Sequence, residues 1–205
     1  MLLSHKYKFI FIKTKKTAGT SVEIELNKLM SDKDIVTPIK PSHQDHTPRN
    51  YIYNGKKLFN HMMMSDLKKI IPKSVHDGYF KFCIEREPVE KCLSDFFMLK
   101  NSLYHIRNKI PLTWKEYLKA GQFPIDTKKY TNENNVLCVD KIIKYENLES
   151  DLFEISQKLG FKFSGVNVRA KSGFRERLVV SQNEREFIYS AFSNSNKFTG
   201  YSLQI

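Results

Sequence analysis

Short runs of strand-forming residues alternate along this chain with segments whose apolar residues recur at helical spacing. The runs FIFI (9–12), YFKFCI (79–84) and VLCVDKIIK (136–144) each precede a helical segment. Alternation of this kind is typical of α/β domains with a parallel sheet. We therefore expect residues 1–205 to form one α/β domain whose central sheet is mainly parallel. The predicted helices cover 20–30, 62–71, 88–97, 112–120, 148–159 and 182–192.

The formal net charge of +12, from 34 Lys and Arg against 22 Asp and Glu, indicates an anionic partner. A nucleic acid, a membrane surface, a nucleotide and an acidic substrate all fit this charge, and a surface of solvated lysines is the simpler alternative. Three cysteines without CxxC spacing favour reduced thiols over a disulfide framework or a zinc site. Because no run approaches the roughly 18 apolar residues of a membrane helix, we expect a cytoplasmic protein without a membrane partner.

The turn after the first strand, KTKKTAGTS at 13–21, combines cations, hydroxyls and small side chains. Small residues let the backbone approach a ligand closely, and the first N–H groups of the following helix point at that ligand. The turn therefore predicts a phosphate cradle, with Thr20 or Ser21 capping the helix. Because Lys16 precedes Gly19, it is not a Walker A motif, and an ordinary strand–turn–helix is the alternative. Two more lysines are expected to be solvated charges beside the loop: Lys13 and Lys15.

The turn after the second strand belongs to the segment REPVEKCLSDF at 86–96. Arg86 follows the strand directly, and Ser94 lies two helical turns further on. An Arg fork and a hydroxyl at one strand–helix junction can hold a second phosphate. The alternative is an ion pair between Arg86 and a nearby carboxylate, for which the candidates are Glu85, Glu87 and Glu90.

The two turns together resemble a known family. KTAGTS at 16–21 resembles the 5′-phosphosulfate loop of sulfotransferases that use 3′-phosphoadenosine 5′-phosphosulfate (PAPS), and 86–96 resembles their 3′-phosphate motif. The pattern is most similar to the carbohydrate branch, with its uronyl 2-O-sulfotransferases and bacterial relatives; looser likeness extends to 145–152 and 169–176. The resemblance implies a P-loop-like three-layer fold, PAPS as sulfate donor, no metal, no nucleic-acid partner, and an acceptor hydroxyl on a saccharide.

The resemblance also implies residue roles. Lys16 contacts the phosphosulfate and stabilises charge on the bridging oxygen as the S–O bond breaks, while the N–H groups of 18–21 hold the 5′-phosphate. Arg86 and Ser94 bind the 3′-phosphate, and the segment around Arg169 resembles the late basic loop that closes on the cofactor. The implied cofactor-binding residues are Lys16, Thr17, Ala18, Gly19, Thr20, Ser21, Arg86, Ser94, Arg169, Lys171, Ser172 and Gly173.

Transfer of a sulfuryl group to a hydroxyl needs a base, and histidine is the usual one. In the carbohydrate branch this histidine lies between the two phosphate motifs, where His61 stands in LFNHMMMSDL. His43 and His46 occupy the same interval and could replace it or line the acceptor pocket. We discount zinc at that pair because only Asp45 accompanies it. Surface roles are expected for His5, His76 and His105.

Two other functions compete with this prediction. A basic nucleic-acid-binding module would explain the charge, but the chain shows no recognisable motif of that class. A P-loop kinase would explain the first turn, but the Gly-Lys order is missing. The acceptor itself is not encoded in a readable pattern, and we expect residues 31–60 and 98–135 to shape its pocket.

Overall fold

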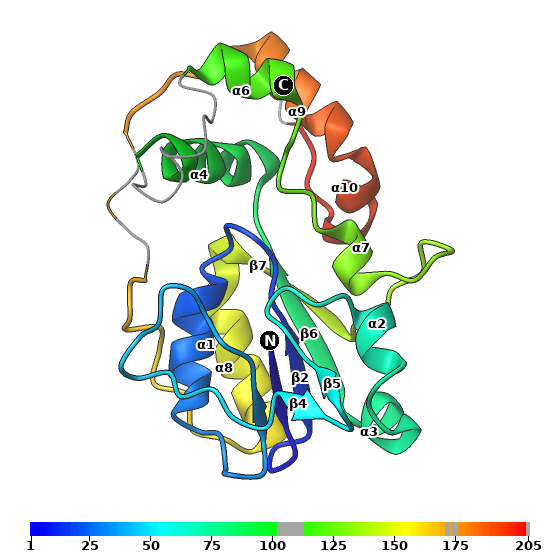
Figure 1. The fold of residues 1–205 in the computed structure, drawn as a ribbon. Coiled ribbons are helices and arrows are strands. Elements are labelled where there is room, and N and C mark those ends of the chain that lie inside the picture. The colour runs from blue at the N-terminus through cyan, green and yellow to red at the C-terminus, as the bar shows by residue number, and fades with distance from the viewer. Residues whose placement is uncertain (102–112, 171–172, 174–175, 204–205) are drawn as a thin grey trace. The chain divides into compact units, whose positions relative to one another are not determined.

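The computed structural model describes residues 1–101, 113–170, 173 and 176–203 (Figure 1). The chain divides into two compact units. The first, called the sheet unit, comprises Met1–Glu85 and Asp126–Ala170. The second, called the helical unit, comprises Arg86–Ile125 and the described part of Lys171–Ile205.

A five-stranded sheet with the order β3-β1-β2-β6-β7 forms the centre of the sheet unit. β2, β6 and β7 are parallel, with Ile12 opposite Cys83 and Ile84 opposite Ile143, whereas β1 is antiparallel to both of its neighbours. The predicted α/β class with a mainly parallel central sheet is therefore confirmed. The strands are β1 (Leu2–Ser4), β2 (Phe9–Ile12), β3 (Ile35–Val36), β6 (Phe80–Glu85) and β7 (Lys141–Lys144).

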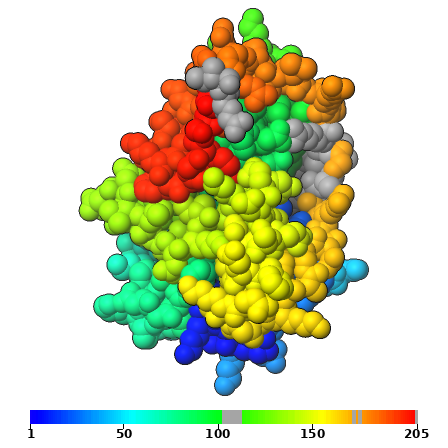
Figure 2. Space-filling model, turned by 180° about the vertical axis from the view of Figure 1, so that it is seen from behind, coloured from blue at the N-terminus to red at the C-terminus, as the bar shows by residue number. Residues whose placement is uncertain are grey.

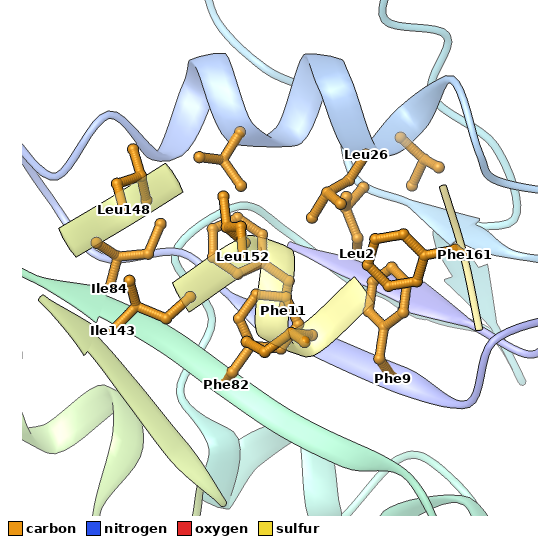
Figure 3. Close-up of a cluster of buried hydrophobic side chains, with 13 residues drawn as sticks. Leu2, Phe9, Phe11, Leu26, Phe82, Ile84, Ile143, Leu148, Leu152 and Phe161 are labelled. Carbon is orange, nitrogen blue, oxygen red and sulfur yellow. The ribbon is translucent and has the colours of Figure 1, made fainter. Parts of the chain in front are cut away.

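Two helices cover one face of this sheet: α1 (Gly19–Asn27) and α8 (Leu148–Leu159). Their apolar residues pack on aromatic side chains of β2 and β6, as Figure 3 shows. Residues of the opposite face are buried as well, so both faces of the sheet are covered. The core of the first face consists of Leu2, Phe9, Phe11, Val22, Leu26, Val36, Phe82, Ile84, Ile143, Leu148, Leu152, Ile155 and Phe161.

Shorter elements complete the sheet unit. A two-stranded hairpin turns at Gly55, whose φ of 72° favours glycine. α2 and α7 contact each other. The elements are β4 (Ile52–Tyr53), β5 (Lys56–Lys57), α2 (Met64–Lys68), α3 (Lys73–Gly78), α7 (Thr127–Tyr130) and the 3₁₀ turn η1 (Tyr145–Asn147).

The helical unit has its own aromatic core. Trp114 stacks on Tyr117, with ring centroids 5.3 Å apart, and meets Phe96 edge-on. Capping boxes begin two of the helices, at Thr113 and Ser181. The described helices are α4 (Pro88–Asn101), α6 (Trp114–Ala120), α9 (Gln182–Ala191) and α10 (Ser193–Thr199).

Several boundaries differ from the sequence prediction. The third strand covers only Lys141–Lys144 of the predicted 136–144, because Leu137 pairs back onto Thr131 in an isolated bridge. The first helix ends at Asn27 and not at residue 30, although the apolar residues that follow it still pack against the core. Packing, and not a continued helix, therefore explains their spacing.

α8 has an apolar side that faces the core and an acidic side that faces outward. Leu152 and Ile155 point to the core, while acidic residues of the other side pair with Lys141 of β7. This helix and its neighbours in sequence form the yellow surface in Figure 2.

Across the described ranges, no helix has both the length and the apolar composition that crossing a bilayer requires.

Candidate active site

The loop between β2 and α1 turns sharply into the helix. Lys16 and Ala18 adopt left-handed backbone conformations, with φ of 62° and 55°, and the helix begins at Gly19. Its first hydrogen bond runs from the Val22 N–H to the Ala18 carbonyl, at 3.1 Å. The N–H groups of residues 18–21 therefore precede the helical ladder at the positive end of the helix dipole. This arrangement suits an anion.

The helix cap differs from the prediction. Ala18, and neither Thr20 nor Ser21, occupies the N-cap position, and no side chain caps the helix there. The reason is the left-handed turn at Ala18, which starts the helix earlier than the apolar pattern suggests. Both hydroxyl residues consequently lie inside the first turn, where their own N–H groups precede the helical hydrogen bonds.

Neighbouring elements anchor this loop. The Lys15 N–H donates to Asp126 Oδ2 at 2.6 Å, and Thr14 Oγ1 donates to the Ile84 carbonyl at the end of β6. Asp126 is itself buried and pairs with Lys129 of α7. The end of β6 and the start of α7 thus hold the loop from two sides. Asp126 lies 111 residues from Lys15, so the sequence carries no local signal for this contact.

The prediction that Lys13 is a solvated charge is wrong. Its side chain is only 3% exposed, and Nζ lies 2.5 Å from Oε2 of the fully buried Glu23 on α1. Gly19 provides the space for this side chain, because a Cβ there would lie 2.9 Å from Lys13 Cγ. Lys15 is exposed, as expected. The buried Glu23 lies beside the loop and belongs to neither of the two sequence motifs.

His61 lies against the same loop. Its Nδ1 is 3.0 Å from the Lys13 carbonyl oxygen, and its backbone N–H donates to Asn60 Oδ1 at 3.1 Å. Because a carbonyl oxygen only accepts, Nδ1 carries the hydrogen of the neutral ring and Nε2 keeps its lone pair. Burial lowers the pKa of His61 to about 4, assisted by the cations of Lys13 and Lys129. The ring is therefore a neutral proton acceptor at pH 7.

The alternative bases lie in different surroundings. His46 is 4% exposed, and within the described chain neither ring nitrogen has a hydrogen-bond partner. Burial lowers the pKa of His46. His43 is half-buried, with Nδ1 near the carboxylate of Asp45. Neither histidine has a recorded hydrogen bond to the loop at 13–18, which distinguishes both from His61.

The histidines expected to have surface roles are half-buried where the structure describes them. His5 shares a 2.8 Å hydrogen bond with the Tyr79 hydroxyl. His76 lies 2.6 Å from an Asp77 oxygen. His105 lies outside the described residues. Both described side chains form their hydrogen bonds with residues outside the loop at 13–21.

The second phosphate motif lies in the helical unit. Arg86 follows the last residue of β6, and α4 begins two residues later at Pro88. Arg86 Nη2 lies 3.1 Å from Glu90 Oε2, so one of the alternative ion pairs is present. Ser94 is half-buried on α4. The 3′-phosphate role of both residues stays a prediction.

The late segment reaches the first loop at one point. The Ala170 N–H donates to Ser21 Oγ at 3.1 Å, next to the exposed Arg169. Glu25 Oε1 accepts from the N–H groups just before it, so residues 167–170 run along α1. Gly173 has a φ of 88°, whereas Lys171 and Ser172 lie outside the described residues.

Comparison with known proteins adds one similarity. No family model matches the chain. Over 119 residues the chain is 28% identical to an uncharacterized protein of Archaeoglobus fulgidus, and the aligned part is 55% of this chain and 96% of that protein. The name of that relative states no activity.

Proposed function

We propose that this protein is a PAPS-dependent sulfotransferase that moves a sulfuryl group to a hydroxyl, with a saccharide as the acceptor, in a P-loop-like three-layer fold. One observation carries the proposal: a tight basic loop at a helix N-terminus lies beside a neutral histidine whose Nε2 can accept a proton. The loop suits a phosphosulfate, and the histidine supplies the base that a hydroxyl acceptor needs.

The residues present fit the anionic donor. The helix N-terminus offers N–H groups, Thr20 offers a hydroxyl, and half-buried Lys16 offers a full charge. Ser21 Oγ accepts from Ala170 and still has its own hydrogen to donate. In this proposal, Arg86 and Ser94 hold the 3′-phosphate. In this proposal the late basic segment also binds the cofactor, through Arg169, Lys171, Ser172 and Gly173.

The proposed transfer is an in-line displacement. His61 Nε2 takes the proton of the acceptor hydroxyl, and the oxygen forms a bond to sulfur. The bond between sulfur and the bridging oxygen breaks, and its electron pair stays on the 5′-phosphate. Lys16 and the loop N–H groups stabilise that charge. The products are the sulfate ester, 3′-phosphoadenosine 5′-phosphate and a protonated His61.

Nucleotide binding tests this proposal. We expect 3′-phosphoadenosine 5′-phosphate to raise the melting temperature more than ATP or a DNA oligonucleotide does, without added magnesium. At 100 times its dissociation constant a ligand adds about 2.7 kcal/mol to the free energy of unfolding, which differential scanning fluorimetry detects readily. Lys16→Ala should reduce the shift, whereas its exposed neighbour Lys15→Ala should not. Stabilisation by DNA alone would instead support a nucleic-acid-binding module.

The 3′-phosphate assignment makes a separate prediction. Arg86→Ala should weaken the bisphosphate nucleotide by about 1.5–3 kcal/mol, the usual contribution of a charged hydrogen bond. Ser94→Ala should cost less, about 0.5–1.5 kcal/mol. Isothermal titration calorimetry measures both, with the analogue lacking the 3′-phosphate as the comparison ligand.

A control separates phosphate binding from support of the fold. Glu90→Gln removes the carboxylate that pairs with Arg86 but keeps the arginine, and it should leave affinity unchanged or increased. If Arg86→Ala weakens both nucleotides equally, the arginine supports the fold and does not contact the 3′-phosphate.

A further inference from the structure

The structure assigns a positioning role to the buried pair of Lys13 and Glu23: the pair fixes the Lys13 carbonyl, which holds His61 with Nε2 as its proton acceptor. This inference rests on the proposed role of His61 as base. Lys13 and Glu23 flank the KTAGTS segment at 16–21, and neither of them touches the reacting atoms in the proposal.

Lys13 connects α1 to His61, through its side chain on one side and its backbone carbonyl on the other. Its ammonium is bound to Glu23 on α1, and its carbonyl accepts from His61 Nδ1. The side chain between them lies against Gly19, at the first position of α1. The helix that carries the anion-binding N–H groups and the proposed base are thereby held to one residue.

Asn60 constrains the other side of the histidine. Its Oδ1 accepts from the His61 backbone N–H, and the same oxygen accepts from the nitrogen of Met1. His61 has a φ of 62°, a left-handed conformation that non-glycine residues adopt only where surrounding contacts enforce it. The ring is therefore fixed through its backbone and through Nδ1, and Nε2 makes no hydrogen bond to the described residues.

Stability alone does not explain a buried ion pair at this position. Neutral side chains of similar volume often stabilise a fold as well as a buried pair does. The pair does have an electrostatic effect on the histidine, because the Lys13 ammonium disfavours a second positive charge on the ring. Burial is the largest cause of the lowered pKa of His61, and Lys129 acts in the same direction as Lys13. The hydrogen bond to the Lys13 carbonyl and the carboxylate of Asp126 both raise this pKa and oppose the cations.

The double variant Lys13→Met/Glu23→Gln tests the inference, because it replaces the pair by neutral side chains of similar length. Glu23 Oε1 also accepts from the buried Met1 ammonium, and the Gln amide oxygen keeps an acceptor for that nitrogen. We expect it to fold, and NMR titration should show the pKa of His61 rising from about 4 toward the ordinary value near 6.5. The ¹⁵N shifts should show a smaller fraction of the Nδ1–H tautomer. The acid limb of the pH–rate profile should move to higher pH, with a lower plateau.

A matched control lies on the same helix. Lys28 and Glu25 form a partly exposed pair, with Nζ and Oε2 2.7 Å apart. The variant Lys28→Met/Glu25→Gln should leave the pKa and the tautomer of His61 unchanged. Gln keeps an acceptor for the two N–H groups that Glu25 binds.

Two results would overturn the inference. One is a folded Lys13→Met/Glu23→Gln variant whose His61 pKa and tautomer equal those of the wild type. The other needs no variant: a wild-type His61 with its hydrogen on Nε2 contradicts the geometry even if the variant fails to fold. Neither readout depends on sulfuryl transfer, so a chain without that activity refutes the proposed function and leaves the positioning of His61 to be decided by NMR.

Discussion

If the proposed function is right, His61→Ala should lower the rate of sulfuryl transfer by about 10²–10⁴-fold, the contribution of a general base, while 3′-phosphoadenosine 5′-phosphate should bind as in the wild type. The two effects should separate because, in the proposed function, the loop at 13–21 and the 3′-phosphate motif hold the nucleotide, whereas His61 acts on the acceptor. Radiolabelled sulfate transfer and calorimetry measure the two quantities on the same preparation. The control is His43→Ala, which should mainly change acceptor affinity.

The pH dependence follows from the environment of His61. Because the pKa of the folded side chain is about 4, kcat/KM should keep its full value down to about pH 5 and lose it below. In the unfolded chain the ordinary pKa is about 6.5, so between these values only the unfolded state takes up the proton. His61 therefore lowers the free energy of unfolding as the pH falls from 6.5 to 4.

Near-normal turnover of His61→Ala would assign the base to another residue.

Phe82→Ala should lower the free energy of unfolding by about 3–5 kcal/mol, the usual cost of truncating a buried aromatic residue. Phe82 is fully buried on β6, stacked on Phe11 at 5.2 Å and tilted toward Phe9 at 5.8 Å between centroids. The cavity would open beneath α1 and α8, where Figure 3 shows the ring in the middle of the core. Urea denaturation followed by circular dichroism measures the change.

The control for this variant is Phe153→Ala on α8. That side chain is 54% exposed, so its removal should change the free energy of unfolding by no more than about 0.5 kcal/mol. Equal losses for the two variants would show that the core is not where the structure places it.

Features with a local physical cause could be predicted from the sequence. Pro88 begins α4 because its missing N–H costs nothing at a helix start. Gly121 and Gly160 end α6 and α8 in left-handed conformations, with φ of 62° and 73°, which glycine adopts without strain. The α/β class follows from the alternation of such local signals, and the loop at 13–21 lies where that alternation predicts.

Only the tertiary structure decided which side chains of the candidate site are buried and which residues they contact. Lys13 and Lys15 are two residues apart and chemically identical, yet one is buried against Glu23 and the other is exposed. No local pattern separates them, because burial depends on Gly19 and on how α1 packs over the sheet. The tautomer of His61 likewise depends on a carbonyl 48 residues away, and its lowered pKa depends on burial and on the cations of Lys13 and Lys129. Long-range contacts and desolvation are properties of the folded chain, so they turn a basic motif into a site with a defined proton acceptor.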